Sequence, residues 1–145
     1  MIRRLAWLLA ITGTLIFAVM TAFLFTSESH IRIPVIAALV TFAMVVISYL
    51  GGIEFGLALR EEGSTEPTRA LAMSISALPS LASWGVFWLN SPQKQIGTVI
   101  ALFVLVWFSD LYLARRGLIP SWFVDLRTAV TVIACAILGV AFYLL

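Results

Sequence analysis

The sequence predicts an all-α integral membrane protein, a compact bundle of five transmembrane helices with its N-terminus in the cytoplasm and its C-terminus outside. Two observations lead to this class. Of 145 residues, 62% are hydrophobic and 11% charged, and the mean hydropathy is +1.09, whereas soluble domains are roughly 45–50% apolar and about 25% charged. The apolar residues also form five continuous runs, each long enough to cross a bilayer as a helix, rather than the alternating pattern of a barrel strand.

The predicted helices together make a single transmembrane domain over residues 1–145 and span about 5–25, 34–59, 67–89, 96–114 and 120–145. The first apolar run is longer than the core of a signal peptide, so we expect it to be retained. Pro34 suits the first turn of the second helix and Pro67 the first turn of the third, because a missing N–H costs nothing there. Gly117 can end the fourth helix in a left-handed conformation. The fifth helix follows Pro120.

The basic residues predict the orientation. Seven of the nine Lys and Arg side chains fall on the side of the N-terminus, and only Arg32 and Lys94 fall on the other side. Positive residues favour cytoplasmic loops, so this side is predicted to be cytoplasmic. The net charge is only +2 and the bases lie at segment ends, which excludes a nucleic-acid-binding face and leaves the lipid bilayer as the expected surroundings. The seven predicted cytoplasmic bases are Arg3, Arg4, Arg60, Arg69, Arg115, Arg116 and Arg127.

Two acids lie inside apolar runs, where a carboxylate costs roughly 2.5–3.5 kcal/mol on insertion scales. Glu54 and Asp110 are at the same predicted depth as Arg127 and near Arg60, so these four residues form a candidate polar cluster. The interpretation we favour is a charge-paired cluster that fixes helix register. The alternative is a cytoplasm-facing polar pocket with a proton-binding carboxylate. No nucleophile or set of metal ligands accompanies the acids, so we predict no catalytic, cofactor-binding or metal-binding residues.

Small residues recur on the second predicted helix. Ser48, Gly52 and Gly56 are four residues apart and share a face, with Gly51 beside them. Such a stripe lets another helix approach closely, and that helix can belong to the same chain or to a second copy.

The third helix carries Pro79 near its middle, where a proline favours a kink. Its serines can border a cavity or donate back to their own backbone. The residues that we predict to line a pocket for a lipid-like or small-molecule ligand are Pro79, Ser80, Trp84, Trp107, Pro120, Trp122 and Thr131.

Two stretches resemble a known family. Residues 49–56, YLGGIEFG, resemble the F/Y-L-G-G-x-x-W-G stretch of the bacterial and mitochondrial family catalogued as domain of unknown function 3429, which includes transmembrane protein 69. Residues 117–131 resemble its later G-x-x-P-x-W-Y-x-x-L-R-x-x-L-T segment. Phe55 and Val130 depart from the pattern, and Glu54 stands where a basic or polar residue is usual. The resemblance implies a small multi-pass protein of the bacterial inner membrane and supplies no catalytic residues.

Three functions are compatible with these observations. The first, which we favour, is a non-catalytic accessory or structural component that packs against itself or against partner membrane proteins. The second is a proton or small-molecule carrier that uses Glu54, Asp110 and Arg127. The third is a binding protein for a lipophilic ligand, or a membrane-embedded enzyme, with a lateral pocket near Arg127.

Overall fold

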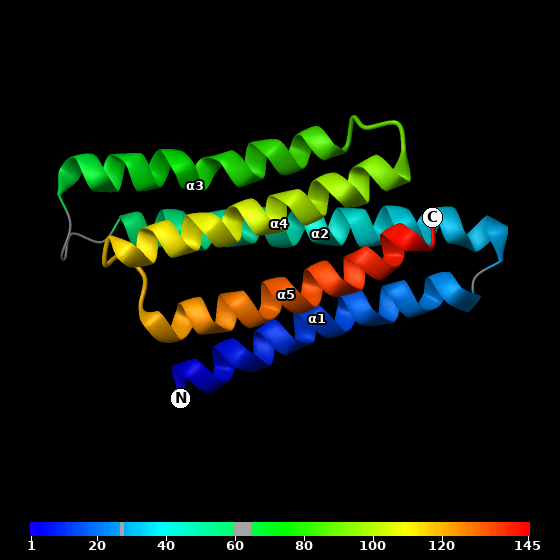
Figure 1. Cartoon of the computed structure of the whole chain (residues 1–145), viewed down its shortest axis with the longest axis horizontal. Coiled ribbons are helices and arrows are strands. Elements are labelled where there is room, and N and C mark those ends of the chain that lie inside the picture. The colour runs from blue at the N-terminus through cyan, green and yellow to red at the C-terminus, as the bar shows by residue number, and fades with distance from the viewer. Residues whose placement is uncertain (27, 60–64) are drawn as a thin grey trace.

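The computed structural model describes residues 1–26, 28–59 and 65–145, and the secondary structure in these ranges is entirely helical. The described residues form five helices, which in sequence order are α1 (Ile2–Thr26), α2 (Ser29–Ala58), α3 (Glu66–Val86), α4 (Pro92–Arg115) and α5 (Ser121–Tyr143). Figure 1 shows that successive helices run in alternating directions. The predicted all-helical class is confirmed. Four of these helices, α1, α2, α4 and α5, are long and apolar enough to cross a membrane, whereas α3, with its four serines, is not among them.

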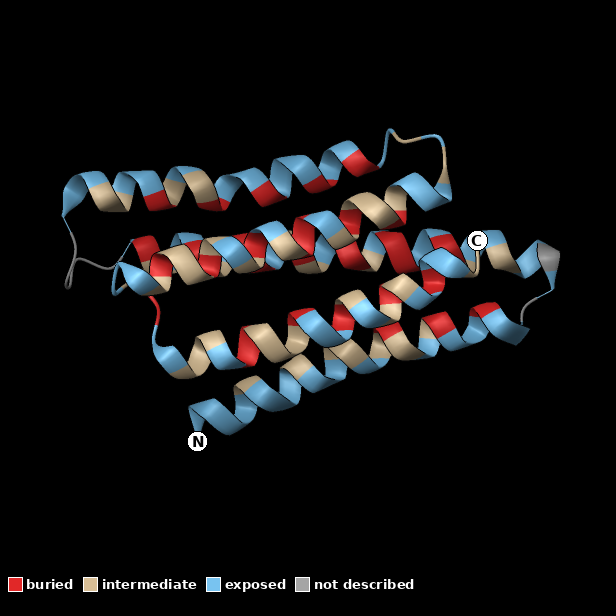
Figure 2. Cartoon of the chain, viewed as in Figure 1, coloured by how far each residue is buried: buried red, intermediate tan, exposed pale blue. Residues whose placement is uncertain are grey.

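The helices pack so that α4 contacts α2, α3 and α5, while α1 covers the side formed by α5 and α2. Buried apolar side chains fill the space between them, among them Leu39, Ile47, Phe103 and Leu138. Figure 2 shows buried residues along the facing sides of the helices and exposed residues on the outer sides. Many of those exposed side chains are large and apolar, which is typical of a surface covered by lipid rather than water.

Several helix ends differ from the prediction, chiefly the starts of α2 and α4, whereas the cap at Gly117 agrees with it. α2 begins at Ser29, so Pro34 lies inside the helix rather than in its first turn. α4 begins at Pro92, four residues before the predicted start, because proline fits the first turn of a helix. Gly117 has a positive φ of 76°, and the N–H of Leu118 donates to the carbonyl of Leu113, so α4 ends in the predicted left-handed cap.

The glycines of α2 divide between two surroundings. Gly51 is buried against α3, where a Cβ atom on Gly51 would lie only 2.6 Å from the backbone oxygen of Ser76. Ser48 also contacts α3 through a hydrogen bond with Ser83, at 3.0 Å. Gly52 and Gly56 instead face open space and are exposed. The close approach of a helix within the chain therefore occurs at Gly51, because α3 lies along that side of α2.

The serines of α3 donate to their own helix, as one of the two interpretations from the sequence predicts. Ser74, Ser76 and Ser83 each donate a hydrogen bond to a carbonyl three or four residues earlier, at 2.8–2.9 Å. These bonds satisfy hydroxyl groups that otherwise would lack partners in an apolar environment.

Candidate functional site

An ion pair joins α4 to α5 in the interior of the bundle. Nε of Arg127 donates to Oδ2 of Asp110 at 2.7 Å. Arg127 is 4% exposed and Asp110 1% exposed, so both charges are withdrawn from the surroundings. Among the described residues, Nε is the only donor of Arg127 with a hydrogen-bond acceptor, which leaves its terminal N–H groups available. A buried charge requires such a partner, because removal from water costs several kcal/mol per ion.

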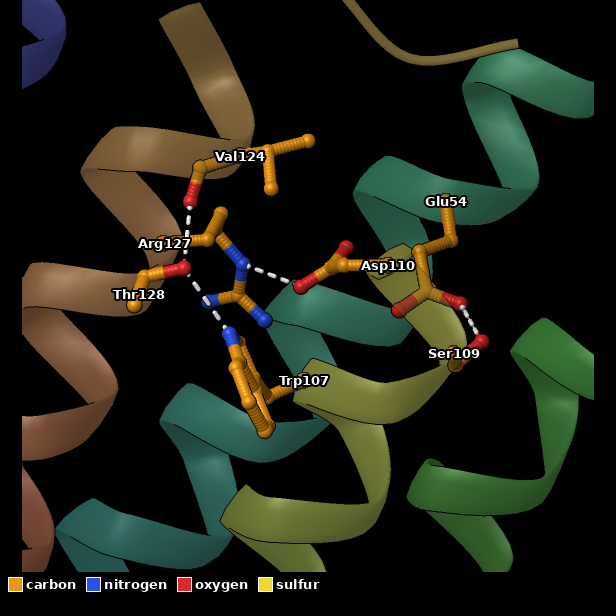
Figure 3. A network of polar contacts seen from close by, with 7 residues as sticks. All are labelled: Glu54, Trp107, Ser109, Asp110, Val124, Arg127 and Thr128. Carbon is orange, nitrogen blue, oxygen red and sulfur yellow. Dashed lines mark hydrogen bonds and ion pairs between the residues drawn. The ribbon is translucent and has the colours of Figure 1, made fainter. Parts of the chain in front are cut away.

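A second carboxyl group approaches the ion pair from α2. Glu54 is 1% exposed, and its Oε2 accepts a hydrogen bond of 2.7 Å from Oγ of Ser109. Glu54 also interacts electrostatically with both Asp110 and Arg127. Figure 3 shows Glu54 and Ser109 on one side of Asp110 and Arg127 on its other side. Three helices, α2, α4 and α5, thus meet at one group of charged side chains.

Two oxygens of these acids have no hydrogen-bond partner among the described residues, namely Oε1 of Glu54 and Oδ1 of Asp110. Buried polar atoms are rarely left unpaired, and each one without a partner costs about 1–3 kcal/mol. The number of charges is also unequal, since two carboxyl groups share a single guanidinium group. The cluster of Glu54, Asp110 and Arg127 is therefore incomplete in both hydrogen bonds and charge.

A second polar contact between α4 and α5 lies beside this cluster. Nε1 of Trp107 donates to the hydroxyl of Thr128 at 2.9 Å, and that hydroxyl donates to the carbonyl of Val124. Figure 3 shows these two hydrogen bonds next to Arg127. Trp107 precedes Asp110 by three residues on α4 and Thr128 follows Arg127 directly on α5, so the two contacts together fix the relative position of the two helices.

An apolar cavity of about 250 Å³ lies next to Arg127. Its wall comes from α1, α2 and α5 with one residue of α4, and includes Leu9, Gly13, Tyr49 and Phe103. Among the described residues of this wall, Arg127 is the only charged one. A second hollow, between α1 and α2, has a wholly apolar lining that includes Leu15, Met20 and Val35. The first cavity thus combines an apolar wall with a charged hydrogen-bond donor.

A sequence-family model described as "Protein of unknown function (DUF3429)" matches residues 2–143. The chain belongs to this family. The predicted membership of the DUF3429 family is thereby confirmed, while the narrower likeness to transmembrane protein 69 stays a prediction. No solved structure matches the chain. Membership of the DUF3429 family and the four long apolar helices indicate a multi-pass membrane protein.

The DUF3429 chain brings three of the four predicted cluster residues together, namely Glu54, Asp110 and Arg127. Arg60 lies outside the described residues. Ser109 and Thr128 were not among the predicted residues, yet they supply hydroxyl groups to the network. The signal for both was their place directly beside Asp110 and Arg127 in the sequence.

The residues predicted to line a pocket are spread over the bundle, and their binding of a ligand stays a prediction. Pro79 is buried against Gly51, and Trp122 lies under the guanidinium of Arg3, 5.6 Å from its ring centre. Thr131 is buried, and its hydroxyl has no hydrogen-bond partner among the described residues. None of the seven borders either of the two cavities: Pro79, Ser80, Trp84, Trp107, Pro120, Trp122 and Thr131.

Proposed function

We propose that this DUF3429 protein is a non-catalytic membrane protein that binds an uncharged lipophilic molecule in the cavity beside Arg127. The observation behind this proposal is a cavity of about 250 Å³ whose wall is apolar except for a few polar groups and one charged donor. An engineered apolar cavity of about 150 Å³ in another protein is large enough to bind benzene. Space for a small ring system, or for part of an acyl chain, is therefore present.

The charges around Arg127 favour an uncharged ligand over an anion. The guanidinium already faces the carboxyl groups of Asp110 and Glu54, so an anionic ligand would add a third acid to a single base. A carbonyl or ether oxygen can instead accept a hydrogen bond from a terminal N–H of Arg127 without adding charge. We therefore assign the ligand to the class of neutral lipophiles that carry a hydrogen-bond-accepting oxygen.

The proposed topology has five spans, with the N-terminus on the cytoplasmic side of a bacterial inner membrane and residues 2–143 in one transmembrane domain. α3 has 21 residues, which at about 1.5 Å per residue is close to the thickness of a bilayer core. It also runs along α2 and α4, and its outer face carries Leu71, Leu78 and Leu81. Labelling of single cysteines at Lys94 and Arg116 with a membrane-impermeant thiol reagent tests this orientation, which requires that only the former react from outside.

Filling the cavity is expected to remove the ligand. Gly13 lines the cavity, and a Cβ atom there would meet nothing within 4 Å, so Gly13→Leu should fit without a clash and occupy the space. Native mass spectrometry of protein released from mild detergent should show a bound lipophile on the wild type. On Gly13→Leu its occupancy should be lower by roughly tenfold or more, and a tenfold loss of affinity is about 1.4 kcal/mol of binding free energy.

The matched control is Gly139→Leu, since Gly139 on α5 also has open space around it and does not line the cavity. This variant should keep the bound mass. Equal retention of the ligand by the Gly13 variant would refute the proposed site, and so would wild-type protein that carries no lipophile.

The accessory role favoured by the sequence is a second candidate, and one observation supports it. Gly52 and Gly56 form a GxxxG face on α2 that stays uncovered in the single chain. Such faces pack closely against another transmembrane helix. A protein partner or second copy seen in the same mass spectra should be lost in Gly56→Leu and kept in Gly85→Leu, whose glycine is also exposed but lies on α3. Retention of the partner in both variants would exclude this face.

A further inference from the structure

We propose that Glu54 and Asp110 hold one proton between them, which makes the centre of the bundle a proton-binding site. The starting point is a count of donors and acceptors around the two acids. Oε2 of Glu54 accepts from Ser109, and Oδ2 of Asp110 accepts from Arg127, both at 2.7 Å. The remaining oxygens, Oε1 and Oδ1, have no donor among the described residues. A carboxylate only accepts hydrogen bonds, so two carboxylates cannot satisfy each other.

One proton removes this deficit. A proton on Oε1 turns Glu54 into a donor, and the carboxyl group of Asp110, with which Glu54 interacts, is an acceptor. Oε1 then has a partner, and Asp110 receives a second hydrogen bond beside that from Arg127.

The same proton balances the charge. With both acids ionised, two negative charges would face one positive charge at positions that are each only 1–4% exposed. An unbalanced charge in such a place is costly, and buried acids in membrane helices are associated with proton relays. With one proton bound, the charges of Glu54, Asp110 and Arg127 sum to zero.

Among the described residues, the other helices bring no charge that could balance the second acid in place of a proton. The charged groups that act on Glu54 are Asp110 and Arg127, and those that act on Asp110 are Arg127 and Glu54.

The ionisable residues outside this cluster are exposed or have other contacts. On α3 they are Glu66, which is exposed, and Arg69, which donates to the carbonyls of Ala58 and Leu59. On α1 they are Arg3, which lies over the ring of Trp122, and Arg4, which is exposed. Asp125 on α5 is also exposed.

Infrared spectroscopy of the intact protein in lipid vesicles at pH 7 tests the proposal, which does not depend on ligand binding. The wild type should show the carbonyl stretch of one protonated carboxylic acid, which shifts when H₂O is replaced by D₂O. Glu54→Gln should lose this band and keep its fold, because the glutamine amide can donate to Asp110 as the protonated acid does. Glu66→Gln, at an exposed acid, should retain it.

The wild-type spectrum alone can overturn the proposal, whatever the variants do. A folded wild type without a protonated carboxyl band would show that both acids are ionised. A sodium-dependent rise in melting temperature that is lost in Glu54→Gln would then show that a cation, rather than a proton, binds between the two acids. A band that persists at full intensity in both Glu54→Gln and Asp110→Asn would place the proton on another acid and would also refute the assignment.

Discussion

Replacing Arg127 with methionine is expected to cause a loss of folding stability of about 3–5 kcal/mol, the size seen when one partner of a buried ion pair is removed. The substitution takes away the donor that lies 2.7 Å from Oδ2 of Asp110, and Asp110 is only 1% exposed. Glu54 cannot replace the lost positive charge, since it is a second acid. The free energy of unfolding, measured by titrating mixed micelles with denaturing detergent, checks the prediction.

Two variants show whether the loss comes from the unpaired charge. Arg116→Met removes an exposed arginine that lies 5.3 Å from the ring centre of Tyr112, and should cost about 1 kcal/mol or less. The double variant Asp110→Leu with Arg127→Met replaces both charges with apolar groups, so it should recover most of the stability. A similar loss in all three variants would indicate that packing, rather than charge, explains the effect.

The fold was largely predictable because four of the described helices are also continuous apolar runs. Composition and run length are enough to indicate α1, α2, α4 and α5, since a chain in lipid must satisfy its backbone hydrogen bonds within each segment. Helix ends were less predictable. A proline in the first turn of a helix and a proline inside the helix leave similar sequence signals. Pro34 lies inside α2, five residues after its first residue, Ser29.

The polar cluster could be anticipated, whereas of the cavity only its place near Arg127 could. A carboxylate in an apolar run needs a partner, so Asp110 and Glu54 directed attention to Arg127, which the structure pairs with Asp110. The cavity depends instead on how α1 packs against α5 and α2, and its wall is built from ordinary apolar residues such as Leu9 and Val130. The residues predicted to line a pocket lie on α3, α4 and α5 or directly before α5, and none of them belongs to this wall.

Gly51→Ala is expected to lower the free energy of unfolding by about 1–3 kcal/mol, the usual cost of forcing extra atoms into a packed interior. A Cβ atom at this position would lie only 2.6 Å from the backbone oxygen of Ser76. Its distance to Cβ of Pro79 would be 3.5 Å, which is an ordinary contact. Backbone atoms cannot turn aside as a flexible side chain can, so α2 and α3 must move apart. The same detergent titration measures the loss.

Gly52→Ala provides the matched comparison, because it makes the same chemical change one residue further along the same helix. A Cβ atom on Gly52 meets nothing within 4 Å, so only the backbone preference changes, and alanine is favoured over glycine in a helix by up to about 1 kcal/mol. Since both variants gain this preference, the difference between them isolates the contact with α3. Equal stabilities of Gly51→Ala and Gly52→Ala would mean that α3 does not pack against Gly51. That result would also argue against the hydrogen bond between Ser48 and Ser83, because it joins the same two helices.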